Sequence, residues 1–160
     1  MKRAAIMRQK GKEMERKYEH LVCRNPLGVD EPQYPWHHIL PYVAIKEQFP
    51  AAFEMELQVI TEAYDMDPIP MVHEYDQFLM FYNCGENLFD FDADIEFTLG
   101  EIGKDAEVYH IDSAVCIHIP AGVYHAPLKF CRIGHPILFM ECSLNHGYKV
   151  TYKPETLEKA

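Results

Sequence analysis

Short segments of alternating apolar and polar residues dominate the chain from about residue 53 onward. Residues 53–60 alternate between Phe, Met, Leu or Val and mainly Glu or Gln, and residues 89–97 alternate between Phe, Ala or Ile and Asp or Glu. A period of two is typical of a strand with one buried face. Further strands are predicted at residues 77–84, 108–111, 115–119, 124–131, 137–143 and 148–152. Gly, Pro and Asp separate these segments, which predicts an antiparallel sandwich or barrel.

The N-terminal third has a different pattern. Within residues 1–24, apolar residues from Met7 to Val22 form one stripe at helical spacing, and Lys and Arg occupy the other faces, so we predict an amphipathic helix. Prolines recur through residues 25–48 and predict an extended, irregular lead-in. The barrel is predicted over residues 49–152, and residues 153–160 form a C-terminal tail.

The charge distribution excludes several classes of partner. The chain has 160 residues, 15 Lys or Arg and 25 Asp or Glu, and a formal net charge of −10, which is typical of one acidic domain. Residues 1–24 hold eight Lys or Arg and three Glu, a balance of +5, so residues 25–160 carry −15. We expect no nucleic-acid binding, which needs a basic surface, and no membrane insertion, since the apolar segments are short.

Five cysteines occur without a Cys-x-x-Cys pair or a secretory signal. They predict reduced thiols in a cytoplasmic protein, and their apolar contexts predict core positions for most of them. We expect a homodimer, with the N-terminal helix packed on the barrel or on a second subunit. A protein that binds a partner through this helix is a further alternative.

Two segments carry candidate chemistry. Pro120, Gly122 and His125 form a Pro-x-Gly-x-x-His turn between two predicted strands. In the other segment, strand alternation places His73 and Gln77 on one face, so both can converge on one ion.

These segments resemble the two motifs of the cupin superfamily. In that superfamily, His-x-His and a carboxylate join the His of Pro-x-Gly-x-x-His around one divalent metal. The resemblance implies an all-β fold, a double-stranded β-helix or jelly-roll barrel, preceded here by the helix and the Pro-rich lead-in. Strand parity favours an alignment with Met71 and His73 at the two histidines and Gln77 at the carboxylate, so the site holds no carboxylate. An alternative alignment starts from His73 and Tyr75 and retains only one ligand.

The resemblance implies a metal site made by His73, Gln77 and His125, with the Met71 thioether as a weak fourth ligand. Fe, Ni, Zn, Mn and Cu are the divalent transition metals that suit such donors. The alternative is a barrel that has lost its metal, in which both histidines are hydrogen-bonded core residues.

Five further side chains are candidates for the substrate pocket: Tyr75, Phe81, Tyr124, Lys129 and His118. Simple alternation from His125 turns Lys129 inward, which favours an anionic small molecule such as a carboxylate. The leading hypothesis is a metal-dependent dioxygenase, isomerase or decarboxylase. The alternative is a cupin that binds a small ligand without catalysis.

Overall fold

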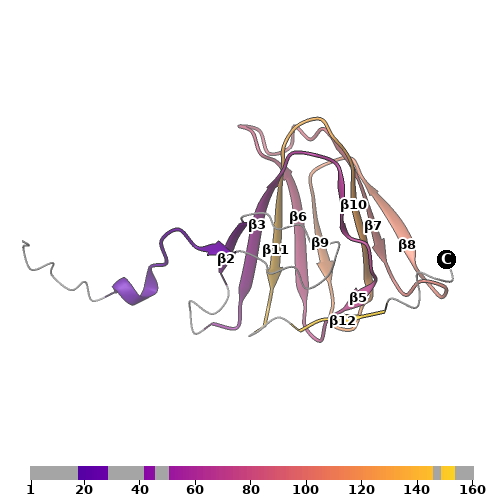
Figure 1. The fold of residues 1–160 in the computed structure, drawn as a ribbon, viewed down its shortest axis with the longest axis horizontal. Coiled ribbons are helices and arrows are strands. Elements are labelled where there is room, and N and C mark those ends of the chain that lie inside the picture. Colours follow the sequence, from indigo (N-terminus) through magenta and orange to yellow (C-terminus); the bar gives the residue numbers. More distant parts are fainter. Residues whose placement is uncertain (1–17, 29–41, 46–50, 146–148, 154–160) are drawn as a thin grey trace, which may run out of the picture.

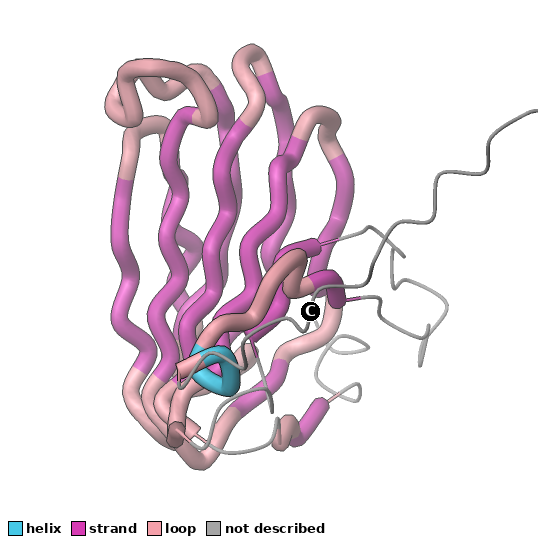
Figure 2. Tube along the Cα trace, turned by 90° about the vertical axis from the view of Figure 1, so that its left-hand side faces the viewer, coloured by secondary structure: helices cyan, strands magenta, loops and turns pink. Residues whose placement is uncertain are grey.

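The computed structural model describes residues 18–28, 42–45, 51–145 and 149–153. In these residues the chain is almost entirely β-structure, arranged as two antiparallel sheets that face each other (Figure 1). Figure 2 shows the long strands of the barrel side by side, with the connecting loops gathered at its two ends.

The first sheet has the strand order β1-β2-β3-β11-β6-β9. Its strands are β1 (Leu27–Gly28), β2 (Tyr42–Ile45), β3 (Glu54–Ile60), β6 (Gln77–Asn83), β9 (Val115–Ile119) and β11 (Ile137–Ser143). The second sheet has the order β12-β5-β10-β7-β8, and β4 also pairs with β10. Its strands are β4 (Tyr64–Asp67), β5 (Met71–Val72), β7 (Ala93–Leu99), β8 (Glu107–Ile111), β10 (His125–Ile133) and β12 (Thr151–Tyr152).

Strand β6 lies between β11 and the edge strand β9 in the first sheet and is buried on its inner face. Its inward residues alternate strictly with half-buried outward ones. Phe81 is fully buried, and its ring centroid lies 5.1 Å from that of Phe139 and 6.3 Å from that of Phe130. Phe81 is four residues from Gln77, about 13 Å along a strand. The prediction that Phe81 lines the substrate pocket is therefore wrong, because it fills the aromatic core instead.

Strand β3 presents the face opposite to the predicted one. Val59 is 46% exposed, whereas Ile60 and Glu54 are buried at 1% and 6% exposure. The register explains this reversal: Ile60 pairs with Ile137 and Glu54 with Ser143 on β11, and directly paired residues point to the same side of a sheet. The alternation was read correctly as a strand, but the apolar side of this strand faces outward.

The outer face of the first sheet is unusually apolar. All nine outward positions on its three adjacent strands β3, β11 and β6 are apolar: Met55, Leu57, Val59, Leu138, Met140, Cys142, Phe78, Met80 and Tyr82. The second sheet differs, since β7 points Asp94 and Glu96 outward and buries Ala93, Ile95 and Phe97.

The predicted N-terminal helix lies mostly outside the described residues. At its end, Glu19–Leu21 form one turn of 3-10 helix rather than an α-helix, and Tyr18, Leu21 and Val22 are exposed. The lead-in is not irregular where it is described, because β2 pairs with β3 and β1 pairs with β2, which extends the first sheet.

All five cysteines are free, and Cys84, Cys116 and Cys131 are exposed, which corrects their expected place in the core. Cys116 alternates outward on β9, so its apolar sequence context does not bury it. Within the described part of the chain, no helix combines the length and apolar character needed to span a membrane.

We predict that Phe81→Ala lowers the free energy of unfolding by about 3–5 kcal/mol, because it removes an aromatic ring at the centre of the core. Urea unfolding followed by circular dichroism measures this change. Phe89→Ala is the matched control, since Phe89 is 76% exposed, and its effect should stay within about 0.5 kcal/mol. Equal effects of the two substitutions would contradict the assignment of Phe81 to the core.

The homodimer remains a prediction, and the apolar outer face provides a test of it. Met140→Glu places a charge on β11, the middle strand of this face, and should shift a dimer toward monomer in sedimentation-velocity measurements. Val108→Glu on β8 of the second sheet, where Val108 is 55% exposed, should leave the dimer intact. A wild-type protein that sediments as a monomer at all concentrations would show that the prediction is wrong.

Candidate metal centre

A backbone hydrogen bond brings the two motif segments together. The Gly122 N–H donates to the His73 carbonyl at 2.8 Å, and the Val123 N–H donates to the Pro120 carbonyl at 3.1 Å to close the turn. Gly122 has a φ of 82°, which glycine adopts without a steric penalty. The Pro-x-Gly turn therefore places His125, the first residue of β10, beside His73.

His73 and His125 form a buried pair. Each is 4% exposed, and their ring centroids are 5.1 Å apart. Met71 is also 4% exposed and pairs with His125 where β5 meets β10. Tyr75 stacks on His73 with a centroid distance of 4.9 Å. In Figure 1, β5 and β12 mark this end of the barrel at the bottom of the view.

The hydrogen bonds of both imidazoles define their tautomers. His73 Nδ1 lies 2.7 Å from the Lys149 carbonyl oxygen, and His125 Nδ1 lies 3.2 Å from that of Val123. Because a carbonyl oxygen can only accept, each Nδ1 carries the proton and each Nε2 carries the lone pair. Histidines that bind metals use this arrangement, with one nitrogen bonded to the backbone and the other to the ion.

Burial keeps both imidazoles neutral. It lowers the pKa of His73 below its ordinary value, and it lowers the pKa of His125 to about 4, with a further contribution from the nearby His73. Neutral imidazole is the form that binds a metal, so neither group needs to lose a proton at neutral pH.

Gln77 contributes a third donor atom. It is 2% exposed, and its Nε2 donates to Glu141 Oε1 at 2.6 Å. A carboxylate accepts from the amide nitrogen, so this contact also fixes which end of the amide is oxygen. Gln77 Oε1 is buried and has no hydrogen-bond partner among the described residues. A buried oxygen in this state is costly unless it meets a cation or a donor.

These donors fit the metal that the motif resemblance implies. Two imidazole nitrogens and an amide oxygen suit a divalent transition metal such as Fe, Ni, Zn, Mn or Cu. In the described residues, no group of three or more His, Cys, Asp or Glu side chains is arranged to hold an ion. The candidate centre therefore has three neutral donors, His73, His125 and Gln77, with Met71 beside them.

Three carboxylates, those of Glu54, Glu56 and Glu141, share the inner face of the first sheet at this end, which corrects the expectation of a site without carboxylates. Glu54 from β3 is 6% exposed and Glu141 from β11 is half-buried, and the charges of both act on the Tyr75 hydroxyl. The sequence signal for Glu54 is the alternation along β3, which places it on one face of the strand and the apolar residues on the other. We call the set listed next the polar end. It comprises Glu54, His73, Tyr75, Gln77, His125, Glu141 and Ser143.

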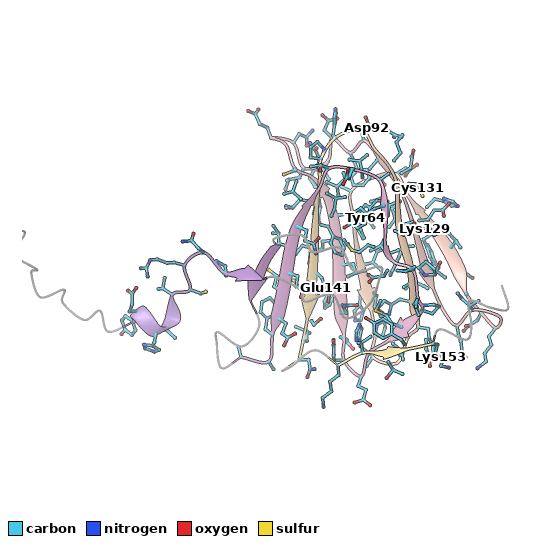
Figure 3. The ribbon with its side chains drawn as sticks, in the orientation of Figure 1. Tyr64, Asp92, Lys129, Cys131, Glu141 and Lys153 are labelled. Carbon is cyan, nitrogen blue, oxygen red and sulfur yellow. The ribbon has the colours of Figure 1, made fainter. Side chains whose placement is uncertain are left out.

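Lys129 is not part of the polar end, which corrects its predicted inward orientation. The register between β10 and β7 shifts between His125 and Leu128, where Ala126 has a φ of 71°. This irregularity reverses the alternation, so His125 and Leu128 are both buried three positions apart. Lys129 pairs instead with Glu96 of β7 on the outer side of the second sheet (Figure 3).

His118 also lies outside the site, contrary to the prediction. It pairs with Phe78 on the outer face of the first sheet, stacks on that ring at 4.8 Å, and its Nε2 lies 2.9 Å from Asp76 Oδ2. The inward position on this strand belongs to the next residue, Ile119, which is 2% exposed.

Tyr124 is half-buried at the rim rather than beside the imidazole pair. The Lys153 ammonium lies 4.4 Å from the centre of its ring and 3.1 Å from a Glu101 carboxylate oxygen. Of the five predicted pocket residues, Tyr75 is the one whose ring stacks on a candidate metal ligand in the described part of the chain.

Comparison with known proteins identifies the fold but no sequence relative. No protein-family model and no curated protein matches the chain. An oxalate decarboxylase from Lactobacillus farciminis, solved as a formate complex, superposes with a TM-score of 0.53 and 13% identity over 85% of this chain. This chain spans 36% of the length of that protein, so the likeness concerns the fold alone.

Two further solved structures are less similar. The hydroxypropylphosphonic acid epoxidase from S. wedmorenis has a TM-score of 0.48 at 9% identity, covering 78% of this chain and 60% of its own. A protein with a double-stranded β-helix domain from Klebsiella pneumoniae has a TM-score of 0.45 at 12% identity, covering 69% and 81%. The predicted fold, a cupin-type double-stranded β-helix, is confirmed by the sheet arrangement and the superposition on oxalate decarboxylase.

Acid should destabilise the metal-free protein through the buried imidazoles. The pKa of His125 is about 4 in the folded chain and 6.5 ordinarily, so the unfolded chain binds more protons between these values. The free energy of unfolding should therefore fall by about 3 kcal/mol as the pH decreases through this window. Urea titrations in EDTA across the window measure the fall.

His125→Gln should remove most of this pH dependence, whereas His110→Gln should retain it. His110 is on the outer face of β8, and its side chain is 75% exposed. A pH dependence that His125→Gln leaves unchanged would contradict the assignment of a neutral, buried His125.

Proposed function

We propose that this protein binds one divalent transition metal at the polar end of the barrel and is an enzyme that acts on a small organic molecule beside it. The observation that carries this proposal is the buried pair of imidazoles. His73 and His125 both direct Nδ1–H to a backbone carbonyl, so the lone pair of each imidazole is on Nε2, the nitrogen that would bind an ion.

Each residue of the polar end has a separate role in this proposal. His73 and His125 hold the metal, and Gln77 supplies an amide oxygen. Glu141 accepts a hydrogen bond from the Gln77 amide nitrogen and so keeps the Gln77 amide oxygen oriented. A divalent transition metal would act there as a Lewis acid toward a substrate oxygen.

Tyr75 is positioned to orient a substrate. Burial raises its pKa to about 12, and the nearby charges of Glu141 and Glu54 add to this effect. The hydroxyl therefore stays protonated at neutral pH and can donate a hydrogen bond. Its stacking on His73 at 4.9 Å also limits rotation of that imidazole.

Cupin-type sites support dioxygenation, isomerisation and decarboxylation, and one fold hosts many chemistries. The proposal therefore names a metal-dependent reaction of a small molecule and assigns the residues that would hold the metal and orient the substrate.

A barrel that binds a small ligand without catalysis is the second candidate. Gln77 replaces a carboxylate with a neutral amide, and three neutral donors bind a divalent ion more weakly than a set that includes an anion. Ligand-induced stabilisation that survives EDTA, without turnover or O₂ consumption, would favour this candidate.

Metal analysis of untagged protein tests the leading proposal. We expect roughly one equivalent of metal per chain after equilibrium dialysis against each of Mn²⁺, Fe²⁺, Ni²⁺ and Zn²⁺ in turn, for at least one of these ions. His125→Ala should weaken this binding by more than the roughly 10–100-fold that loss of an outer hydrogen-bond partner costs.

His118→Ala is the matched control, because this histidine is on the outer face with Asp76 and should bind metal as the wild type does. Substoichiometric metal in the wild type, or binding that His125→Ala leaves unchanged, would rule out the proposed site.

A further inference from the structure

The polar end contains more acceptor groups than a metal needs. Glu54 enters it from β3 and Glu141 from β11, strands that lie outside both sequence motifs. Ser143, two residues after Glu141 on β11, is paired with Glu54 on one side and with Gln77 on the other. Carboxylates thus form one wall of the end that holds the imidazole pair.

The Tyr75 hydroxyl is an independent observation that indicates a ligand. Tyr75 is 8% exposed, and its hydroxyl has no hydrogen-bond partner among the described residues. Ser143 and the Lys149 backbone lie near it, but not in hydrogen-bonding geometry. A buried phenol without a partner is costly, so a ligand atom that accepts its proton would relieve that cost.

The surroundings of this hydroxyl select the charge of the ligand. Both carboxylates lie at the polar end, because Glu54 is paired with Ser143 and Glu141 accepts hydrogen bonds from Gln77 at 2.6 Å and Ser143 at 3.5 Å, and the charges of both also raise the pKa of Tyr75. An anionic group placed there would meet two like charges, whereas an ammonium group would donate hydrogen bonds to both. Lys129, which had favoured an anionic ligand, lies on the outer side of the barrel.

We propose that the ligand of this site is a small amine that also carries an oxygen, such as an amino alcohol. Its ammonium group binds to Glu54 and Glu141. Its oxygen accepts a hydrogen bond from the Tyr75 hydroxyl and faces the imidazole pair. This inference rests on the proposed function only for the contact between the ligand oxygen and the metal, and the preference for positive charge is independent of it.

Three probes of nearly equal size separate charge from shape: ethanolamine, ethylene glycol and glycolate. At about pH 7 they are cationic, neutral and anionic, and each carries a hydroxyl group. We expect ethanolamine to raise the thermal midpoint and to bind at least about tenfold more tightly than ethylene glycol, with glycolate weaker still. Titrations use both metal-loaded and EDTA-treated full-length protein.

Two substitutions locate the effect. Glu54→Gln preserves the size of the side chain and should weaken ethanolamine binding about tenfold, while metal content stays at the wild-type level. Tyr75→Phe should weaken ethanolamine and ethylene glycol alike, because both lose the same hydrogen bond. Glu96→Gln, on the outer face of β7, is the control and should change neither.

The outcomes distinguish this inference from the metal proposal. Ethanolamine selectivity in protein that binds no metal would support the inference and reject the metal site. Normal metal content with glycolate bound as tightly as ethanolamine would retain the metal site and overturn the inference. Ethanolamine binding that Glu54→Gln leaves unchanged would also overturn it.

Discussion

The register of β6 is the constraint on which the rest of this barrel depends. The strand lies between β11 and β9, and Gln77 pairs with Ser143 on one side and Ile119 on the other. A shift of one residue would turn Gln77 and Phe81 outward together, because side chains alternate with a period of two. The same register therefore places Phe81 in the aromatic core and directs the Gln77 amide to Glu141 at the polar end.

The interior of the barrel is divided along its length by chemistry. At one end the core is closed by aromatic and aliphatic side chains, including Phe81, Phe130 and Phe139. At the other end, buried polar groups replace them, and their desolvation is offset by backbone bonds such as that from His73 to Lys149. Apolar packing is thus concentrated at one end of the barrel and buried polar groups at the other, which explains why the substitutions proposed at the two ends have different readouts.

The outer surfaces of the two sheets have opposite character. The first sheet presents nine apolar positions on β3, β11 and β6, whereas the second presents charged residues such as Asp94, Glu96 and Lys129. The charged residues behind the net charge of −10 are therefore distributed unevenly over the two outer faces. The apolar side of β3 is the outer one, so the rule that the apolar face of a strand is the buried face fails for this strand.

Local pattern determined much of this protein. The period of two predicted the strands, and the Pro-x-Gly turn predicted the position of His125, because each of these depends on neighbours within a few residues. The continuous strand expected through His73 and Gln77 is wrong, since residues 73–76 connect β5 of the second sheet to β6 of the first, although His73, Tyr75 and Gln77 are all buried. Only the tertiary structure decided what depends on pairing between distant segments. The register of β3 on β11 brought Glu54 inside, and an irregularity in β10 turned Lys129 outward. Neither leaves a signal in the alternation of a single strand, since a strand's own sequence does not specify which side its partner will bury.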